Sequence, residues 1–237
     1  SWKLYVSDDA SGDVGAFTSW SITFNYSGQA AFTWSPGTGL NTTSGATVTA
    51  GPSAPGQSYT VTATNGACTS TANVNVVVNP LPTVTCPGNS SVCVNAAAYT
   101  LNGTGENPTG GTFNGTGVTA NNFDPATAGV GTHTITYSYT DGNGCSNSCQ
   151  FTITVNGLPT VTCPANSNVC VDASSFTLTG GSPAGGTYSG TGVSGGNFDP
   201  ATAGVGTHTI TYSYTDGNSC TNTCQFTITV NALPVVT

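Results

Sequence analysis

Nine cysteines are the residues of this 237-residue sequence whose types and spacing most clearly suggest chemistry. Eight of them fall into two sets of four, and Cys68 stands apart; the sets are Cys86, Cys93, Cys145 and Cys149, and Cys163, Cys170, Cys220 and Cys224. Four thiolates can hold zinc, but six residues separate the first two cysteines and three separate the last two, unlike the tight Cys-x2-Cys pairs of zinc ribbons. We therefore expect disulfides in both sets.

Sequence leaves three possible pairings in each set. Pairs of neighbouring cysteines would close short loops, whereas links from the first segment of the set to its last hairpin would close loops of about 50–65 residues. Chain entropy favours the long closures, at about 4 kcal/mol against roughly 2–2.5 kcal/mol for the short ones. We favour long closures within each set and leave the exact pairing open. For Cys68, a buried thiol and a disulfide to another molecule or an upstream segment both remain open.

Acidic residues suggest one metal site. Asp8, Asp9 and Asp13 crowd a single loop, where three carboxylates could gather Ca²⁺. Aspartates in turns more commonly cap backbone N–H groups, so calcium is one of two interpretations. No other cofactor is expected.

Catalytic chemistry is not indicated. His133 and His208 occupy equivalent positions in two near-identical segments, which is typical of half-buried strand histidines. No serine sits in a G-x-S-x-G turn, and Lys3 is the only basic side chain that could stabilise an oxyanion or a phosphate. We predict that the chain is not an enzyme.

The charge composition excludes further classes of function. Charged residues make up 4% of the chain, against roughly 25% in ordinary soluble domains, and the formal net charge is −8. Nucleic-acid binding needs Lys and Arg to displace phosphate counterions, so it is excluded. Membrane insertion is not expected either, because no apolar run approaches the roughly 20 residues of a spanning helix.

The elements that carry these residues form a tandem array. The segment FDPATAGVGTHTITYSYTDGN occurs at 123–143 and again, unchanged, at 198–218. Two complete units therefore run over 81–157 and 158–232, and 233–237 begins a further one. Within a unit, His133, Ile135 and Tyr137 alternate with threonines, as in a half-buried strand.

About seven short strands in each unit predict an all-β fold of tandem immunoglobulin-like sandwiches. Because the linkers are short, we expect the sandwiches to stack as a rod. The sequence of residues 27–80 predicts an incomplete sandwich of the same kind, in which Trp34 anchors the core. Residues 1–26 predict a β-hairpin that must pack on something else, since a lone hairpin is marginally stable.

The segment SWKLYVSDDASGDVGAFTSWSITF resembles the last hairpin of a proprotein-convertase P domain. The segments FTWSPGTGL, SYTVTATNGACTSTA and GTHTITYSYTDGNGC are similar to the Ig-like or PKD-like repeats of large secreted Bacteroidota-type surface proteins. This resemblance implies an extracellular or cell-surface array exported by the type IX route. Residues 27–80 depart from it, because they lack the early cysteine and first strands of such units.

These observations favour a non-catalytic structural or adhesive protein: a segment of a stalk, adhesin or fibre. Its expected partners are itself or neighbouring repeats, through a homopolymer formed by strand addition, and a cell-surface ligand whose identity the sequence leaves open. One alternative is an accessory targeting region of a secreted protease, which the P-domain resemblance suggests. Another is a glycan-binding adhesin that uses Trp2, Trp20 or exposed tyrosines.

Overall fold

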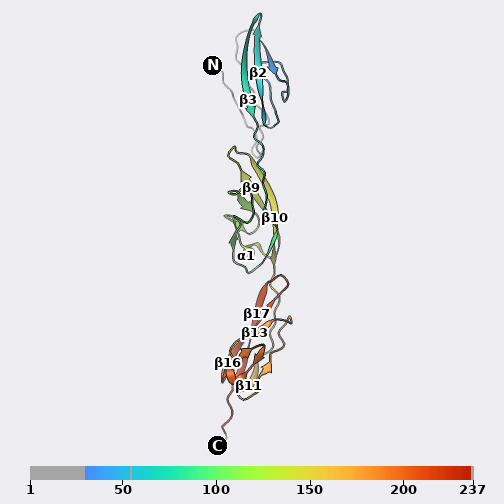
Figure 1. Ribbon diagram of the computed structural model, residues 1–237. Coiled ribbons are helices and arrows are strands. Elements are labelled where there is room, and N and C mark those ends of the chain that lie inside the picture. The colour runs from blue at the N-terminus through green and yellow to red at the C-terminus, as the bar shows by residue number, and fades with distance from the viewer. Residues whose placement is uncertain (1–29, 54, 236–237) are drawn as a thin grey trace. The chain divides into compact units, whose positions relative to one another are not determined.

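The computed structural model describes residues 30–53 and 55–235 and is nearly all β (Figure 1). The predicted hairpin at 1–26 lies outside the described residues, and so do Asp8, Asp9 and Asp13 with their calcium hypothesis. The chain divides into two compact units. One comprises Ser1–Pro87, Asn102–Phe113 and Thr136–Gln150, and the other comprises Gly88–Leu101, Asn114–Ile135 and Phe151–Thr237.

The first sheet has three antiparallel strands in the order β1-β2-β3. These are β1 (Ala31–Ser35), β2 (Gly56–Asn65) and β3 (Cys68–Val77), and Figure 1 shows β2 and β3 as one long hairpin. Trp34 is 3% exposed and donates its indole N–H to the carbonyl of Gly45 at 3.0 Å. It packs with Val48, Tyr59 and Val61, so the prediction that Trp34 anchors a core is confirmed.

The second repeat shows the architecture of the complete units. Its elements are β11 (Ser167–Cys170), β12 (Phe176–Thr177), β13 (Thr187–Ser189), β14 (Val193–Ser194), β15 (Asn197–Phe198), α2 (Pro200–Ala203), β16 (Gly206–Thr215) and β17 (Thr221–Asn231). One sheet has the order β11-β17-β16-β13 and the other the order β12-β15-β14. Its core consists of apolar side chains from both sheets and the turns between them: Leu178, Phe198, Ile210, Phe226, Ile228 and Val230.

The first repeat has the same elements in the same order. They are β4 (Ser90–Cys93), β5 (Tyr99–Thr100), β6 (Thr112–Asn114), β7 (Val118–Thr119), β8 (Asn122–Phe123), α1 (Pro125–Ala128), β9 (Gly131–Thr140) and β10 (Ser146–Asn156). Its sheets are β4-β10-β9-β6 and β5-β8-β7. The all-β tandem sandwich predicted from the sequence is therefore correct.

Alternation along the long strands decides which face is buried. In β9, Ile135 and Tyr137 are both 0% exposed, while Thr132 and Thr134 face solvent. Across the antiparallel pair β16–β17, the outward Thr207 and Thr229 hydroxyls lie 3.2 Å apart. Threonine thus gives these sheets a polar face without charge, as its branched side chain suits a pleated surface.

The first strand of each repeat pairs in parallel with the last one. In the second repeat the register runs from Ser167 opposite Ile228 to Cys170 opposite Asn231. Just before β11, the side chain of Asn166 accepts the Thr227 N–H at 2.9 Å and extends the ladder. As a result, Cys170 lies beside the end of the strand at which the chain leaves the repeat.

Each repeat also contains one helical turn that the sequence analysis did not predict. In α1 the Asp124 carboxylate accepts the Ala126 N–H at 3.0 Å and the Thr127 hydroxyl at 2.6 Å. Pro125 follows at the first helical position, where its fixed φ and missing N–H carry no penalty. The hydrogen bond from the Thr127 hydroxyl lowers the pKa of Asp124.

A buried tyrosine holds the glycine-rich loop of each repeat against the sheet. In the second repeat the Tyr212 hydroxyl accepts the Gly186 N–H at 2.9 Å and donates to the Pro183 carbonyl. A Cβ at Gly186 would lie 2.5 Å from this tyrosine ring, so only glycine fits the approach. Tyr137 makes the same contacts with Gly111 and Pro108.

We predict that Tyr212→Phe lowers the free energy of unfolding of the second repeat by about 1–3 kcal/mol, because the half-buried Gly186 N–H and the half-buried Pro183 carbonyl lose their partner. Hydrogen exchange of peptides from β16 and β17 measures this loss. Tyr214→Phe is the control, since Tyr214 lies two residues further along β16 and is only half-buried. Equal effects of the two substitutions would contradict the role assigned to the Tyr212 hydroxyl.

Candidate functional site

Three disulfides are the chemical feature that organises the described residues. Cys86 bonds to Cys149 and Cys163 bonds to Cys224, at sequence separations of 63 and 61. Each joins the segment before the first strand of a repeat to its last strand, as long closures require. The third disulfide joins Cys93 to Cys220, at a separation of 127.

This third disulfide corrects the prediction that all four cysteines of each unit pair within that unit. Cys93 belongs to the first repeat and Cys220 to the second, and both lie in the second compact unit. Cys145 and Cys170, which were predicted to form disulfides, stay reduced thiols. The prediction followed from counting four cysteines per repeat, whereas pairing depends on the end of the repeat at which each one lies.

Cys93 lies at the exit of the first repeat for a topological reason. The parallel pairing of β4 with β10 places Cys93 opposite Asn156, the last residue of β10. The Val94 N–H then bonds to the Asn156 carbonyl at 2.9 Å. The chain continues from Asn156 toward the second repeat, so Cys93 sits beside the linker.

Cys220 lies at the entry of the second repeat. The turn that contains it connects β16 to β17, and the Asn222 amide donates to the carbonyl of Pro159 in the incoming linker at 2.9 Å. A cysteine at the exit of one repeat and a cysteine at the entry of the next are thereby brought together. The two repeats are joined by a peptide linker and, in addition, by a disulfide.

Asp216 fixes the turn that presents Cys220. Its carboxylate accepts the N–H groups of Asn218 and Cys220, both at 2.9 Å, and its own N–H donates to the Cys220 carbonyl at 3.0 Å. Cys220 is 0% exposed. This Asx-type turn determines where the sulfur lies, which makes Asp216 a positioning residue for the disulfide.

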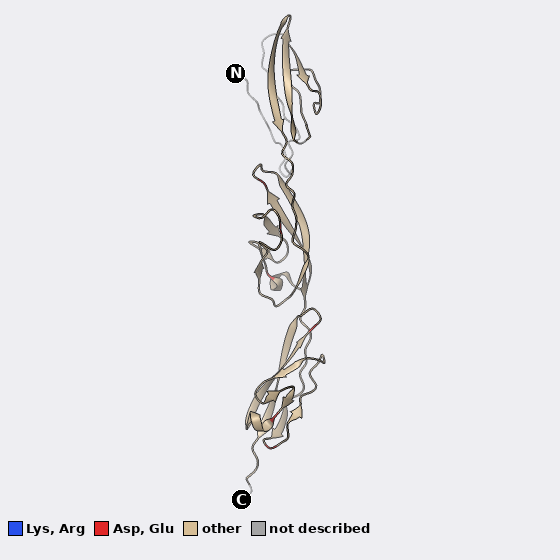
Figure 2. Cartoon of the chain, viewed as in Figure 1, with Lys and Arg blue, Asp and Glu red and all other residues tan. Residues whose placement is uncertain are grey.

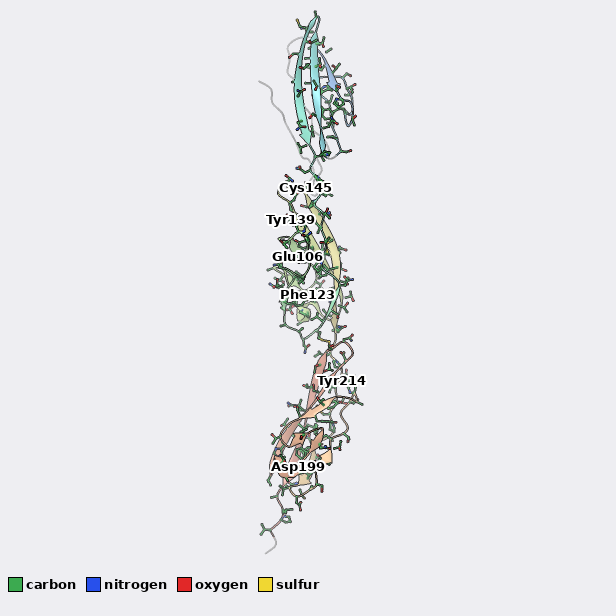
Figure 3. The ribbon with its side chains drawn as sticks, viewed as in Figure 1. Glu106, Phe123, Tyr139, Cys145, Asp199 and Tyr214 are labelled. Carbon is green, nitrogen blue, oxygen red and sulfur yellow. A yellow bond between two sulfur atoms is a disulfide. The ribbon has the colours of Figure 1, made fainter. Side chains whose placement is uncertain are left out.

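Asp141 builds the same turn in the first repeat, where it accepts the Cys145 N–H at 2.9 Å. Figure 3 places Cys145 at this turn between β9 and β10. Cys145 is 3% exposed, and its sulfur lies 3.9 Å from the carbonyl oxygen of Asn79. The turn that holds Cys145 therefore has the same hydrogen bonds as the turn that holds Cys220. Unlike Cys220, Cys145 is not in a disulfide.

Cys68 is exposed, at the start of β3 beside the turn from β2. The interpretation from the sequence that Cys68 is a buried thiol is therefore wrong, because Cys68 is exposed. A disulfide from Cys68 to another molecule or to an upstream segment stays a prediction.

Glu106 is a buried carboxylate that the sequence analysis missed. It is 7% exposed and accepts the Gly103 N–H at 2.7 Å and the Gly105 N–H at 3.2 Å. Burial raises its pKa, but the hydrogen bonds from backbone N–H groups outweigh burial and lower the pKa from the ordinary value of 4.5. The available signal was a single glutamate within a glycine-rich loop.

The two histidines have structural partners. The Nε2 atom of His133 lies 2.9 Å from the Gly129 carbonyl and that of His208 lies 2.8 Å from the Gly204 carbonyl. Both are half-buried in their strands, as predicted. Within residues 30–53 and 55–235 no group of three or more His, Cys, Asp or Glu side chains could hold a metal ion.

In Figure 2 the short red stretches that mark Asp and Glu are scattered along the described ribbon, and none of the described ribbon is coloured blue for Lys or Arg. Neither of the short helices found in the described part of the chain has the length or apolar character to cross a membrane.

Comparison with known proteins identifies the repeat. Residues 79–155 and 157–230 each match the family of the HYR domain, an Ig-like extracellular domain type. No curated protein matches the sequence.

Solved structures are similar at low identity. The chain is 14% identical to a three-immunoglobulin-domain variant of titin, with a TM-score of 0.39, covering 90% of this chain and 92% of that one. It is 16% identical to a Ca²⁺-stabilized adhesin that helps an Antarctic bacterium bind ice, with a TM-score of 0.41 and coverages of 92% and 69%. An endo-fucoidan hydrolase of glycoside hydrolase family 107 shares 17% identity at a TM-score of 0.28, with 86% of this chain covered but 39% of that chain. No function is transferred from these similarities.

We predict that Ser219→Gly raises the free energy of unfolding of the second repeat by about 0.5–1 kcal/mol. Ser219 has a φ of 64°, and Gly144 holds the equivalent position with a φ of 83°. The left-handed region costs a residue with a Cβ about 1–2 kcal/mol, which exceeds the roughly 0.5–1 kcal/mol of extra chain entropy that glycine loses on folding. Chemical denaturation followed by hydrogen exchange of β16 and β17 measures the gain, and Gly144→Ser should have the opposite sign in β9 and β10.

We predict that Glu106→Gln destabilises the first repeat by about 1–3 kcal/mol at pH 7 and has no effect at strongly acidic pH. The folded-state pKa is lowered, so the carboxylate stabilises the fold above pH 4.5 and this contribution is lost as pH falls through the lower folded-state value. Hydrogen exchange of residues 102–113 at pH 7 and under acid conditions measures the difference. The second repeat has no glutamate and should not change; a pH-independent effect in the first repeat would refute the electrostatic explanation.

Proposed function

The chain belongs to the HYR-domain family through two tandem copies, and from this premise we propose that it is a non-catalytic, load-bearing segment of an extracellular structural or adhesive protein. The single observation that carries the proposal is the disulfide between Cys93 of the first copy and Cys220 of the second. Binding or catalysis by either copy alone would not require a covalent bond between them.

Disulfides shorten the covalent path along which a pulling force is transmitted. Force that enters at Leu81 crosses from Cys86 to Cys149, then follows the chain to Cys163 and crosses to Cys224. Only about 27 of the roughly 150 residues between Leu81 and Ala232 lie on that path, so at ~3.4 Å per residue they extend to roughly 90 Å instead of about 500 Å. An unfolded repeat therefore stays short.

The connection between the repeats is double. From Cys149 to Cys163 one path follows the peptide linker. The other runs from Cys86 to Cys93, crosses to Cys220 and reaches Cys224. A break in either path leaves the other intact, which suits a segment under tension.

The surface chemistry supports an extracellular location. The described outward faces carry Thr, Ser and Asn, and the only lysine of the sequence is Lys3, so trypsin-like proteases have one cleavage site. Disulfides persist in oxidising compartments and are rare in reducing ones. The Bacteroidota-type surface array, its type IX export and the P-domain end are finer proposals that rest on the sequence resemblance.

Three other hypotheses stay predictions from the sequence: polymerisation by strand addition, an accessory role for a secreted protease, and glycan binding. Nothing among the described residues favours one of them over the load-bearing role.

Pulling single molecules of the full chain by their ends tests the proposal. In oxidising buffer we expect neither HYR copy to release the 61–63 residues enclosed by its own disulfide. With a reductant, two further steps of roughly 200 Å each should appear, from the enclosed residues at ~3.4 Å apiece. Cys93→Ser combined with Cys86→Ser and Cys149→Ser should restore one of these steps without reductant, because these substitutions remove both disulfide crossings over the first copy.

Long steps from both copies in oxidising buffer would refute the shielding by disulfides. Turnover of a substrate by the purified chain would refute the non-catalytic assignment, whatever the pulling experiment gives.

A further inference from the structure

We propose that Cys170 is a covalent docking site for a further HYR domain, which supplies a cysteine at the position of Cys220. The bond formed would repeat the one between Cys93 and Cys220. This inference does not require the chain to bear load, because it concerns how domains are joined and not what the joined domains do.

Cys170 and Cys93 have the same backbone environment. Cys170 ends β11 opposite Asn231, as Cys93 ends β4 opposite Asn156. The following residue, Val171, donates its N–H to the Asn231 carbonyl at 2.9 Å, and Val94 does the same to Asn156 at 2.9 Å. Both cysteines therefore sit at the exit end of their repeat.

The two cysteines differ in what covers them. Cys93 is half-buried and bonded to Cys220, whereas Cys170 is an exposed thiol. The first repeat thus has a disulfide at this position, and the second repeat has a thiol at the equivalent position. A thiol held in place at a sheet end, in an otherwise disulfide-rich chain, is poised for the same linkage.

The required partner is defined by the entry turns of the two copies. Cys220 and Cys145 both lie in an aspartate-capped turn between the last two strands, and both are buried, at 0% and 3% exposed. Such a turn belongs to the end of an HYR domain at which the chain enters. Cys68 does not fit, because it is exposed beside the turn between β2 and β3.

The linker sequence indicates that the partner domain is joined in the same chain. Asn231-Ala232-Leu233-Pro234 repeats the pattern of Asn156-Gly157-Leu158-Pro159, through which the first repeat joins the second. Tethering through so short a linker gives the partner cysteine an effective concentration in the millimolar range. A second copy of the chain lacks this advantage, and the turn that it would need to present holds the buried Cys145.

The reaction is a two-electron oxidation. The Cys170 thiolate attacks one sulfur of a small-molecule disulfide such as oxidised glutathione, and one glutathione thiolate leaves. The thiolate of the partner cysteine then attacks the mixed disulfide, forms the protein disulfide and releases the second glutathione.

Thiol labelling of the full chain and of an extended chain tests the proposal. The extended chain continues after Ala232 with a second copy of residues 158–237 in which the counterpart of Cys170 is replaced by Ser, so that only Cys170 itself is read, and both chains are oxidised in a glutathione buffer. In the 237-residue chain, Cys170 should react with a maleimide under native conditions. In the extended chain its labelling should fall to background, and peptic peptides at low pH should contain Cys170 disulfide-bonded to the added counterpart of Cys220.

Replacement of that added cysteine by Ser is the matched control and should restore labelling of Cys170. The added copy's own disulfide, equivalent to Cys163–Cys224, reports that the added copy has folded. If that disulfide is missing, the test is repeated with an added copy of residues 81–157, in which Cys145 takes the Cys220 position.

Full labelling of Cys170 beside a folded added copy would overturn the proposal. The proposal would also be overturned if Cys170 preferred the Cys170–Cys170 bond of a dimer, as the 237-residue chain could form it, to the intrachain bond of the extended chain.

Discussion

The disulfide between the segment that opens each repeat and its last strand is the constraint on which the other features depend. A domain of about 75 residues buries little apolar surface, and the core of the second repeat consists of six buried side chains with a few half-buried neighbours. Closing a loop of 61 or 63 residues removes about 4 kcal/mol of chain entropy from the unfolded state, which is comparable to the whole stability of a small domain. It also holds the first strand near the last one, so that the short parallel pairs β4–β10 and β11–β17 can form.

Scarcity of charge determines how the remaining acidic groups are used. With Lys3 as the only basic side chain of the sequence, carboxylates find their partners among backbone N–H groups. Asp216 caps the turn of Cys220, Asp124 begins α1, and Glu106 binds two glycine N–H groups inside the first repeat. Apart from the Asp124 bond to the Thr127 hydroxyl, these bonds go to the backbone and shape loops. Each acid thus fixes a backbone path that the glycine-rich sequence would otherwise leave open.

Much of the fold follows from the sequence because its strands alternate clearly. The pattern around Ile135 and Tyr137 predicts β9 and its buried face, and the exact repetition at 198–218 predicts that the second copy has the same strands. The one-turn helices were missed although Asp124-Pro125 is a capping signal, because four residues carry no helical periodicity. The pairing of Cys93 could not be derived, since counting cysteines says nothing about which end of a sandwich each occupies. Glu106 was missed because its burial depends on a loop folding back over it.

The parallel first strand is the element that turns separate sandwiches into a covalently joined series. Had β4 paired antiparallel with β10, Cys93 would lie at the opposite end of that short ladder, away from Asn156, where the chain leaves the repeat. The hairpin turn between β16 and β17 complements this arrangement, because it meets the incoming linker through Asn222 and Pro159. An exit cysteine and an entry cysteine are thus consequences of one topology, and any repeat that keeps this topology and both cysteines carries both halves of the link. The second repeat keeps both: its entry cysteine is Cys220, already bonded, and its exit cysteine is Cys170.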